Sequence, residues 1–368
     1  SLYRRAGRNK ELVDFAQQVR QAYASDAAIR RMATLGLAES YALMRQRDKA
    51  IETLEQYAAE ASVPKGDAAE ALLQAAEHYN ADRNYDKSLA ACAKAVKLGL
   101  PDDRAAKAMS MMQEFRWRAK DYAGCADVLV RLLDDRYLQH LPSYYRFTYA
   151  YRYANCLITA ERAKEAEIFC ESEIRRETED AILQRWMLLL GDIQAKAKRY
   201  DEALRTYERM FTQCAGVADR WSDAQHRIVD ILMKKGDFAP AVDAARICLD
   251  ASDGGNALIG NIRLLAEALK NADGNVARAN AFLAFQKYGP AGPDGKAGTA
   301  DDLTDPLADV PRAKLPHREK AFAAARAEAG DNAMASRLRA QSYLYTGHPA
   351  EALKLYVDAF QRADLYEW

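Results

Sequence analysis

One pattern recurs along most of this 368-residue chain and constrains its fold more than any other feature. Each copy has an apolar-periodic run, a short polar turn, and a second apolar run that opens on a small residue. These small residues are Ala50, Ser88, Cys125, Ala166, Ala203, Ala241, Ala279 and Ala352. Their positions differ by 38, 37, 41, 37, 38, 38 and 73 residues, and the last step is close to two periods. A constant period of this length predicts stacked helical units that share one continuous core.

The clearest copy shows which repeat this is. Leu190-Gly191 closes a first run, a basic turn follows, Ala203 opens the second run, and Tyr207 lies four residues later. This arrangement resembles the tetratricopeptide repeat, a helix–turn–helix unit of 34 residues. The resemblance implies an all-α, right-handed superhelical solenoid of antiparallel helix pairs, with about eight to nine repeats. The longer period implies helices or turns extended by about one helical turn.

The same pattern divides the chain into three parts. Residues 1–288 carry the helical repeats, residues 289–315 form an inserted loop, and residues 316–368 hold C-terminal helices that include a final repeat. The loop is predicted because four of the ten prolines fall within it, and proline does not continue a helix. Long loops inside compact folds are commonly functional or disordered.

Four carboxylates in the inserted loop suggest a metal site. The residues are Asp294, Asp301, Asp302 and Asp305. Residues 294–302 resemble Gly/Asp-rich loops of secreted bacterial proteins, some of which hold calcium, and carboxylate oxygens suit that cation. The spacing is not that of an EF-hand, and the same residues also fit Asx-type turns with solvated carboxylates. Calcium is therefore one hypothesis and a turn loop is the other, and no other cofactor is expected.

No residue cluster indicates catalysis. The five histidines are scattered and form neither a zinc-binding HExxH motif nor a cluster with cysteine, and GxSxG and Walker-type loops are absent from the sequence. We therefore expect a protein that is not an enzyme. The six cysteines form no CxxC pair, and four occupy small-residue positions of the repeat. Buried free thiols are expected, which favours a reducing compartment.

Charge and hydropathy restrict the partners. Lys and Arg together number 53, as do Asp and Glu, and the two signs alternate without a long basic stripe, so no nucleic-acid partner is expected. No segment approaches the roughly 20 apolar residues that span a bilayer, so direct membrane insertion is not expected either. The sequence has no apolar signal-peptide core near Ser1, and we leave the compartment open between cytoplasm and periplasm.

The richest aromatic segment lies at 144–153, where six of ten residues are Tyr or Phe. A helix with 3.6 residues per turn cannot direct six such side chains into one stripe, so some must lie on a second face. In the tetratricopeptide family, the first helix of each repeat lines a concave groove that takes peptides. The resemblance, with the register of the copies, places seven residues in that groove: Glu114, Trp117, Thr148, Tyr151, Asn155, Leu188 and Asp192.

These residues suggest roles in binding. Trp117 and Tyr151 would be anchors, because large aromatic side chains often carry binding energy. Asn155 would hydrogen-bond a ligand main chain, and Glu114 and Asp192 would favour a ligand with basic residues. The alternative, that the rings only fill the interface between repeats, stays open.

The sequence therefore predicts a scaffold or adaptor of a bacterial-type assembly that binds a protein or peptide in its concave groove. Two alternatives remain. One is a recruiting or regulatory domain of a larger polypeptide, and the other is a self-assembling structural solenoid.

Overall fold

A computed structural model describes residues 9–214, 220–251, 255–274, 276–288, 290, 292–295 and 298–308. Within these ranges the chain forms sixteen helices and no strand, so the prediction of an all-α fold is confirmed there. The predicted final repeat around Ala352, and the whole of 316–368, lie outside the described residues.

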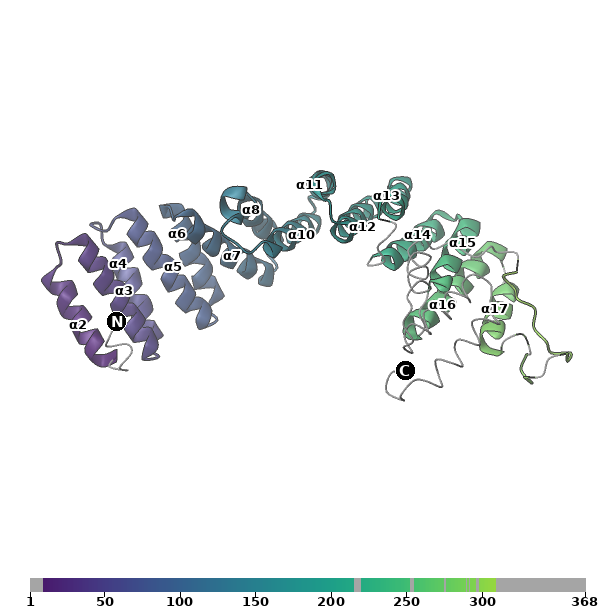
Figure 1. Cartoon of the computed structure of the whole chain (residues 1–368), viewed down its shortest axis with the longest axis horizontal. Coiled ribbons are helices and arrows are strands. Elements are labelled where there is room, and N and C mark those ends of the chain that lie inside the picture. Colours follow the sequence, from purple (N-terminus) through teal and green to yellow (C-terminus); the bar gives the residue numbers. More distant parts are fainter. Residues whose placement is uncertain are drawn as a thin grey trace, which may run out of the picture. The chain divides into compact units, whose positions relative to one another are not determined.

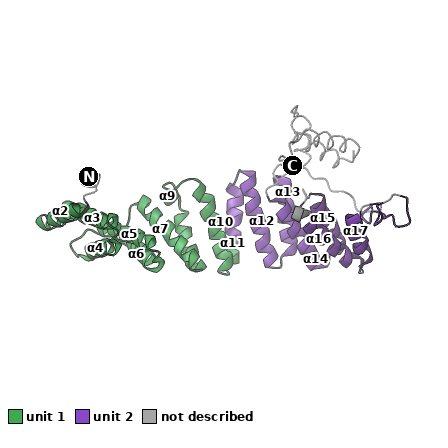
Figure 2. Ribbon diagram, turned by 90° about the horizontal axis from the view of Figure 1, so that it is seen from below, with its two compact units in different colours: residues 1–166 green, residues 167–368 purple. Residues whose placement is uncertain are grey.

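The chain divides into two compact units, residues 1–166 and 167–368 (Figure 2). The first unit begins with helix α2 (Asn9–Ala22), and its other helices follow in the order labelled in Figure 1. They are α3 (Ala27–Leu43), α4 (Arg47–Ala59), α5 (Lys65–Ala81), α6 (Tyr85–Leu98), α7 (Asp102–Arg118), α8 (Tyr122–Leu132), the short α9 (Asp135–Leu138) and α10 (Tyr144–Thr159). Helix α11 (Ala163–Arg176) contains the boundary between the units.

The second unit continues the same alternation of paired helices. Its helices are α12 (Asp180–Lys196), α13 (Tyr200–Gln213), α14 (Trp221–Lys235), α15 (Phe238–Asp250), α16 (Gly255–Asp273) and α17 (Ala277–Tyr288). Consecutive helices pack against each other across short turns, as expected for helical hairpins.

A residue in the left-handed conformation closes the first helix of each pair. These residues are Arg45, Arg83, Lys120, Glu161, Lys198, Gly236 and Gly274, with φ between 59° and 80°. Each lies five residues before a small residue of the sequence pattern. From Arg45 to Gly236, the residue after each left-handed residue donates its N–H to a carbonyl five residues earlier in the chain. The N–H of Gln46, for example, donates to the carbonyl of Tyr41 at 2.8 Å, which satisfies a carbonyl at the helix end. The period predicted from the sequence therefore recurs in the backbone conformation of the turns.

The small residues lie where the paired helices approach most closely. Ala50, Ser88, Cys125 and Ala203 are fully buried. Ser88 Oγ donates to the carbonyl of Ala76 at 2.7 Å, so its hydroxyl holds the second helix of the pair against the first. All six cysteines are buried and none forms a disulfide, as predicted, and burial raises the pKa of the Cys92 thiol to about 12.

The inserted loop is attached to the last described hairpin. Leu307 is 2% exposed and belongs to the core cluster that contains Phe282 of α17. Arg278 Nε donates to the carbonyl of Pro306 at 3.0 Å. The loop therefore contributes to the core of the second unit. Among the described helices, none combines the length and the apolar content that crossing a membrane requires.

Candidate functional site

A hollow of about 320 Å³ lies between α7 and α10 in the first unit, and we call it the α7/α10 groove. The side chains that give it chemical character are Ser110, Glu114, Arg118, Tyr145, Thr148, Tyr149 and Arg152. The α7 residues are spaced by four, and the α10 residues by three, one and three. Each set therefore occupies one face of its helix.

Glu114 is the electrostatic centre of the groove. Its two carboxylate oxygens accept hydrogen bonds from Arg118 Nε at 2.8 Å and Arg152 Nη1 at 2.7 Å. Partial burial acts to raise the pKa of Glu114, but the hydrogen bonds and charges of Arg118 and Arg152 outweigh it and hold that pKa below its usual value. Glu114 is therefore ionised near neutral pH, and its charge is compensated twice.

Tyrosine rings stack along the wall of the groove on α10. The centroids of Tyr145 and Tyr149 lie 5.0 Å apart, and those of Tyr144 and Tyr145 lie 4.3 Å apart. Tyr149 is buried, its hydroxyl lies 2.6 Å from Ser110 Oγ, and burial raises the pKa of its phenol. Tyr144 is 64% exposed. The stack therefore leads from the core to the surface.

Two of the predicted groove residues, Glu114 and Thr148, line the α7/α10 groove. Trp117 instead packs edge-on against Tyr122 with ring centroids 5.3 Å apart, and the guanidinium of Arg152 lies 5.2 Å from its ring centroid. The indole is therefore already covered on one face by a cation from the same protein.

Tyr151 and Asn155 lie on the neighbouring face of α10. The ring of Tyr151 is 5.5 Å from that of Phe147, and Asn155 Nδ2 donates to the carbonyl of Tyr151 at 2.8 Å. Neither residue lines the groove. Each step of one residue turns the helix by about 100°, so a residue next to a groove-lining residue faces another side of the helix. Three residues that line the groove were not among those predicted from the sequence: Tyr145, Tyr149 and Arg152. The signal available in the sequence was the presence of arginine within the aromatic run 144–153, of which Arg152 lines the groove.

The two predicted groove residues of the second unit, Leu188 and Asp192, contact other residues of that unit. Leu188 is 7% exposed and belongs to the core, which disfavours the predicted contact with a ligand, and that contact stays a prediction. Asp192 Oδ1 accepts hydrogen bonds from Tyr207 Oη at 2.8 Å and Arg227 Nε at 2.5 Å. Both predicted carboxylates, Asp192 and Glu114, are already paired with arginine. This pairing weakens their expected attraction for basic ligands, which stays a prediction.

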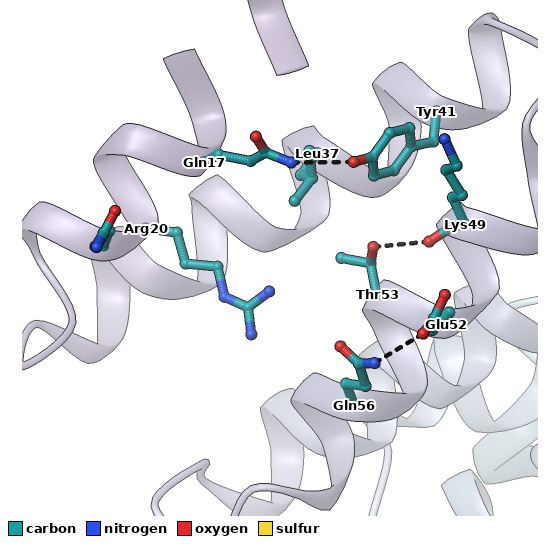
Figure 3. A pocket seen from close by; sticks show the side chains of 9 residues that line it. Gln17, Arg20, Leu37, Tyr41, Lys49, Glu52, Thr53 and Gln56 are labelled. Atoms are coloured by element: carbon teal, nitrogen blue, oxygen red, sulfur yellow. Dashed lines mark hydrogen bonds between the residues drawn. The ribbon is translucent and has the colours of Figure 1, made fainter. Parts of the chain in front are cut away.

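Another hollow, of about 510 Å³, is lined by α2, α3 and α4 (Figure 3). Gln17 Nε2 donates to Tyr41 Oη at 3.1 Å, and Gln56 Nε2 donates to Glu52 at 3.0 Å. Arg20 is bound to Glu60 at 2.9 Å. These polar side chains bind one another, so the hollow is built mainly of bridges within and between helices.

The loop carboxylates proposed as calcium ligands act as acceptors in turns. Asp301 accepts the N–H of Asp294 at 3.0 Å and contacts Thr299 Oγ1 at 2.6 Å, and Asp302 accepts the N–H of Gly298 at 2.8 Å. Within the part of the chain that the structure describes, no group of three or more His, Cys, Asp or Glu could hold a metal ion. This geometry favours the turn interpretation, and calcium binding stays a prediction.

Comparisons with known proteins locate the fold. No protein-family model matches the chain, and no curated protein matches it. The solved structure of Naa15/Naa10 bound to HypK-THB matches with a TM-score of 0.57 and 15% identity, covering 99% of this chain and 54% of that chain. The present chain thus spans about half the length of that relative.

Two further solved structures have lower TM-scores. The apo form of RapI has a TM-score of 0.43 and 11% identity, covering 98% of this chain and 94% of that chain. The P58(IPK) TPR domain has a TM-score of 0.23 and 10% identity, covering 98% and 90%. The helical hairpins, their period and the likeness to the Naa15/Naa10 structure together show a tetratricopeptide-like helical-repeat fold.

Proposed function

We propose that this protein is a non-catalytic interaction scaffold that holds a protein or peptide partner in the α7/α10 groove. The observation that supports this most is the partly exposed tyrosine stack beside two arginines in one hollow of the surface. Tyrosine and arginine are enriched among the residues that dominate binding energy at interfaces. The Naa15/Naa10 structure, bound to HypK-THB, is a protein assembly that includes a fold of this kind.

The charges of the groove favour a partner with an acidic group. Glu114, Arg118 and Arg152 are its charged lining residues, which leaves one positive charge in excess. Each guanidinium has five N–H donors, more than its contacts with Glu114 require. A carboxylate of the partner would reach these donors while an apolar or aromatic neighbour packs on Tyr145.

The test uses a partner captured from the native organism and then measured by calorimetry with the purified chain. Tyr145→Ala is expected to weaken binding by about 2 kcal/mol, roughly 30-fold, which is typical of a residue that dominates an interface. Tyr23→Ala is the matched control, since Tyr23 is 52% exposed and lies outside the groove residues. A Tyr145→Ala protein with unchanged melting temperature and parental affinity would place the site elsewhere.

A further inference from the structure

Two cysteines, Cys125 of α8 and Cys156 of α10, meet in the core of the first unit. Both side chains are fully buried, neither forms a disulfide, and their thiols are hydrogen-bonded to each other. The first helices before and after α10 carry Phe115 and Ile193 at the place that Cys156 takes in α10, and both are buried. The repeat therefore accepts larger apolar side chains there and does not require two thiols in contact.

The thiol pair borders residues that line the α7/α10 groove. Cys156 follows Arg152 by four residues, about one helical turn, on α10. Cys125 Sγ lies 3.3 Å from the carbonyl oxygen of Gln113, and the side chain of Gln113 accepts a hydrogen bond from Arg152 at 2.8 Å. Gln113 and Arg152 both line the groove. The wall of the groove and the thiol pair therefore share one network of contacts.

The two thiols differ in acidity. The hydrogen bond with Cys125 lowers the pKa of the Cys156 thiol and, together with the positive charge of Arg152, outweighs burial. The same hydrogen bond, with burial, raises the pKa of the Cys125 thiol. Because the thiolate is the reactive form of cysteine, Cys156 should be oxidised first. Burial instead raises the pKa of three other thiols to about 12: Cys92, Cys170 and Cys248.

We infer that Cys125 and Cys156 are a redox-sensitive pair, which hydrogen peroxide converts into a reversible disulfide between α8 and α10. Hydrogen peroxide is small and uncharged, so the local openings of a native protein give it access to buried thiols. The inference concerns a modification site and does not depend on which partner the groove holds.

The reaction balances with peroxide as the oxidant. The Cys156 thiolate attacks one peroxide oxygen, so that an S–O bond forms, the O–O bond breaks, and the departing hydroxide takes the proton that Cys156 released. The sulfur of Cys125 then attacks the sulfur of the sulfenic acid, so that the S–S bond forms, the S–O bond breaks, and water leaves with the thiol proton of Cys125. The two sulfurs lose two electrons in total, and one peroxide is reduced to two waters.

The disulfide would change the wall of the groove. Its sulfurs lie about 2.0 Å apart, closer than any hydrogen bond, so α8 and α10 are drawn together and Cys125 gives up its bond to the Gln113 carbonyl. Trp117 reports this change, because its ring packs against Tyr122 of α8 and lies beside the guanidinium of Arg152 of α10.

The test exposes the full chain to hydrogen peroxide, blocks the remaining thiols with iodoacetamide in denaturant, and maps a protease digest by mass spectrometry. We expect one linked peptide pair that joins Cys125 to Cys156, formed at least about tenfold faster than oxidation of the other four cysteines and lost after dithiothreitol. The indole N–H signal of Trp117 in NMR should shift on oxidation and return on reduction. The signal of Trp186, in the second unit, should not move.

Serine variants separate the chemistry from folding. Ser88 and Ser40 occupy the places of Cys125 and Cys156 in earlier copies of the repeat, and Ser88 Oγ donates to a carbonyl twelve residues earlier, as Cys125 does. Both variants should therefore fold. Cys125→Ser should accumulate sulfenic acid at Cys156, which dimedone traps, whereas Cys156→Ser should leave Cys125 unoxidised. Cys92→Ser is the matched control and should form the disulfide as the parent does.

Two results would overturn the inference: absence of the disulfide between Cys125 and Cys156, or oxidation of all six cysteines at equal rates. A disulfide that leaves the Trp117 signal unmoved would overturn its effect on the groove.

Discussion

The ring of Tyr207 lies so close to Gly191 that a Cβ built on the glycine would be 2.2 Å from Tyr207 Cε1. Tyr207 is fully buried, and its hydroxyl is fixed by Asp192, so the ring cannot move without losing that bond. We predict that Gly191→Ala lowers the free energy of unfolding by about 1–3 kcal/mol, the usual cost of overpacking a core.

Gly36→Ala is the matched control for this prediction, since a Cβ there meets no atom within 4 Å. It should stabilise the chain by about 0.5–1 kcal/mol. Urea unfolding followed by circular dichroism measures both changes, and equal stabilities for the two variants would show that the Tyr207 contact does not constrain Gly191.

The left-handed turn residues give a second prediction. Lys198 has φ of 61°, a conformation that costs a residue with a Cβ about 1–2 kcal/mol. Lys198→Gly removes this strain but adds freedom to the unfolded chain, so a net stabilisation of about 0.5–1 kcal/mol is expected. Gly236→Ala, at the equivalent turn with φ of 80°, should destabilise by about 1 kcal/mol. The same sign for both substitutions in urea unfolding would contradict this account of the turn.

His78 gives a pH dependence. Burial is the largest influence on the ring and lowers the pKa of His78 below its usual value of 6.5. The unfolded chain therefore takes up a proton at His78 more readily than the folded chain. The contribution of His78 to the free energy of unfolding is present above pH 6.5 and is lost as pH falls through the folded pKa. The loss should be small, because His78 is only partly buried.

Unfolding in urea between pH 8 and 5.5 measures this loss, and His78→Gln should flatten the curve. Carboxylates with lowered pKa, such as Glu114, act only below about pH 4.5, so they do not obscure this window. An identical slope in parent and His78→Gln would assign the pH dependence to other groups.

One variant of a loop carboxylate distinguishes the calcium interpretation of the loop from the turn interpretation. If Asp294, Asp301, Asp302 and Asp305 hold calcium, millimolar calcium should raise the melting temperature by mass action, and Asp301→Ala should abolish the rise. If they only shape turns, calcium has no effect. Asp301→Ala then lowers the melting temperature equally with calcium or with a chelator, because the N–H of Asp294 loses its acceptor.

The sequence was sufficient to predict the repeat, because close approach of paired helices demands a small residue at Ala50, Cys125 and Ala203 in every copy. It did not reveal the turns as left-handed, because Arg45 and Lys198 occupy the place where glycine is the usual signal.

The sequence led to the helix that forms one wall of the candidate site, but it did not identify which face of that helix lines the groove. The aromatic segment led to α10, and Thr148 does line the groove. Tyr151 and Arg152 differ by one residue, which changes the face of the helix, and only the packing of α7 against α10 selects between them. Leu188 precedes the Leu190-Gly191 pair in a run of apolar residues, where composition does not distinguish a core face from a ligand face.

The last prediction concerns the sign of the ligand charge in the α7/α10 groove. Glu114 compensates Arg118 and Arg152, so Glu114→Gln removes a negative charge and leaves both guanidiniums unbalanced. A partner with an acidic group should then bind several-fold more tightly, because one charge at about 4 Å in a solvated site is worth roughly 1 kcal/mol. Arg118→Gln should weaken the same partner. Asp243→Asn, an exposed acid on α15, is the matched control and should change nothing. Calorimetry at low and high salt measures all three variants, and the effects should shrink at high salt. Tighter binding by Arg118→Gln and weaker binding by Glu114→Gln would restore the basic ligand that the sequence alone suggested.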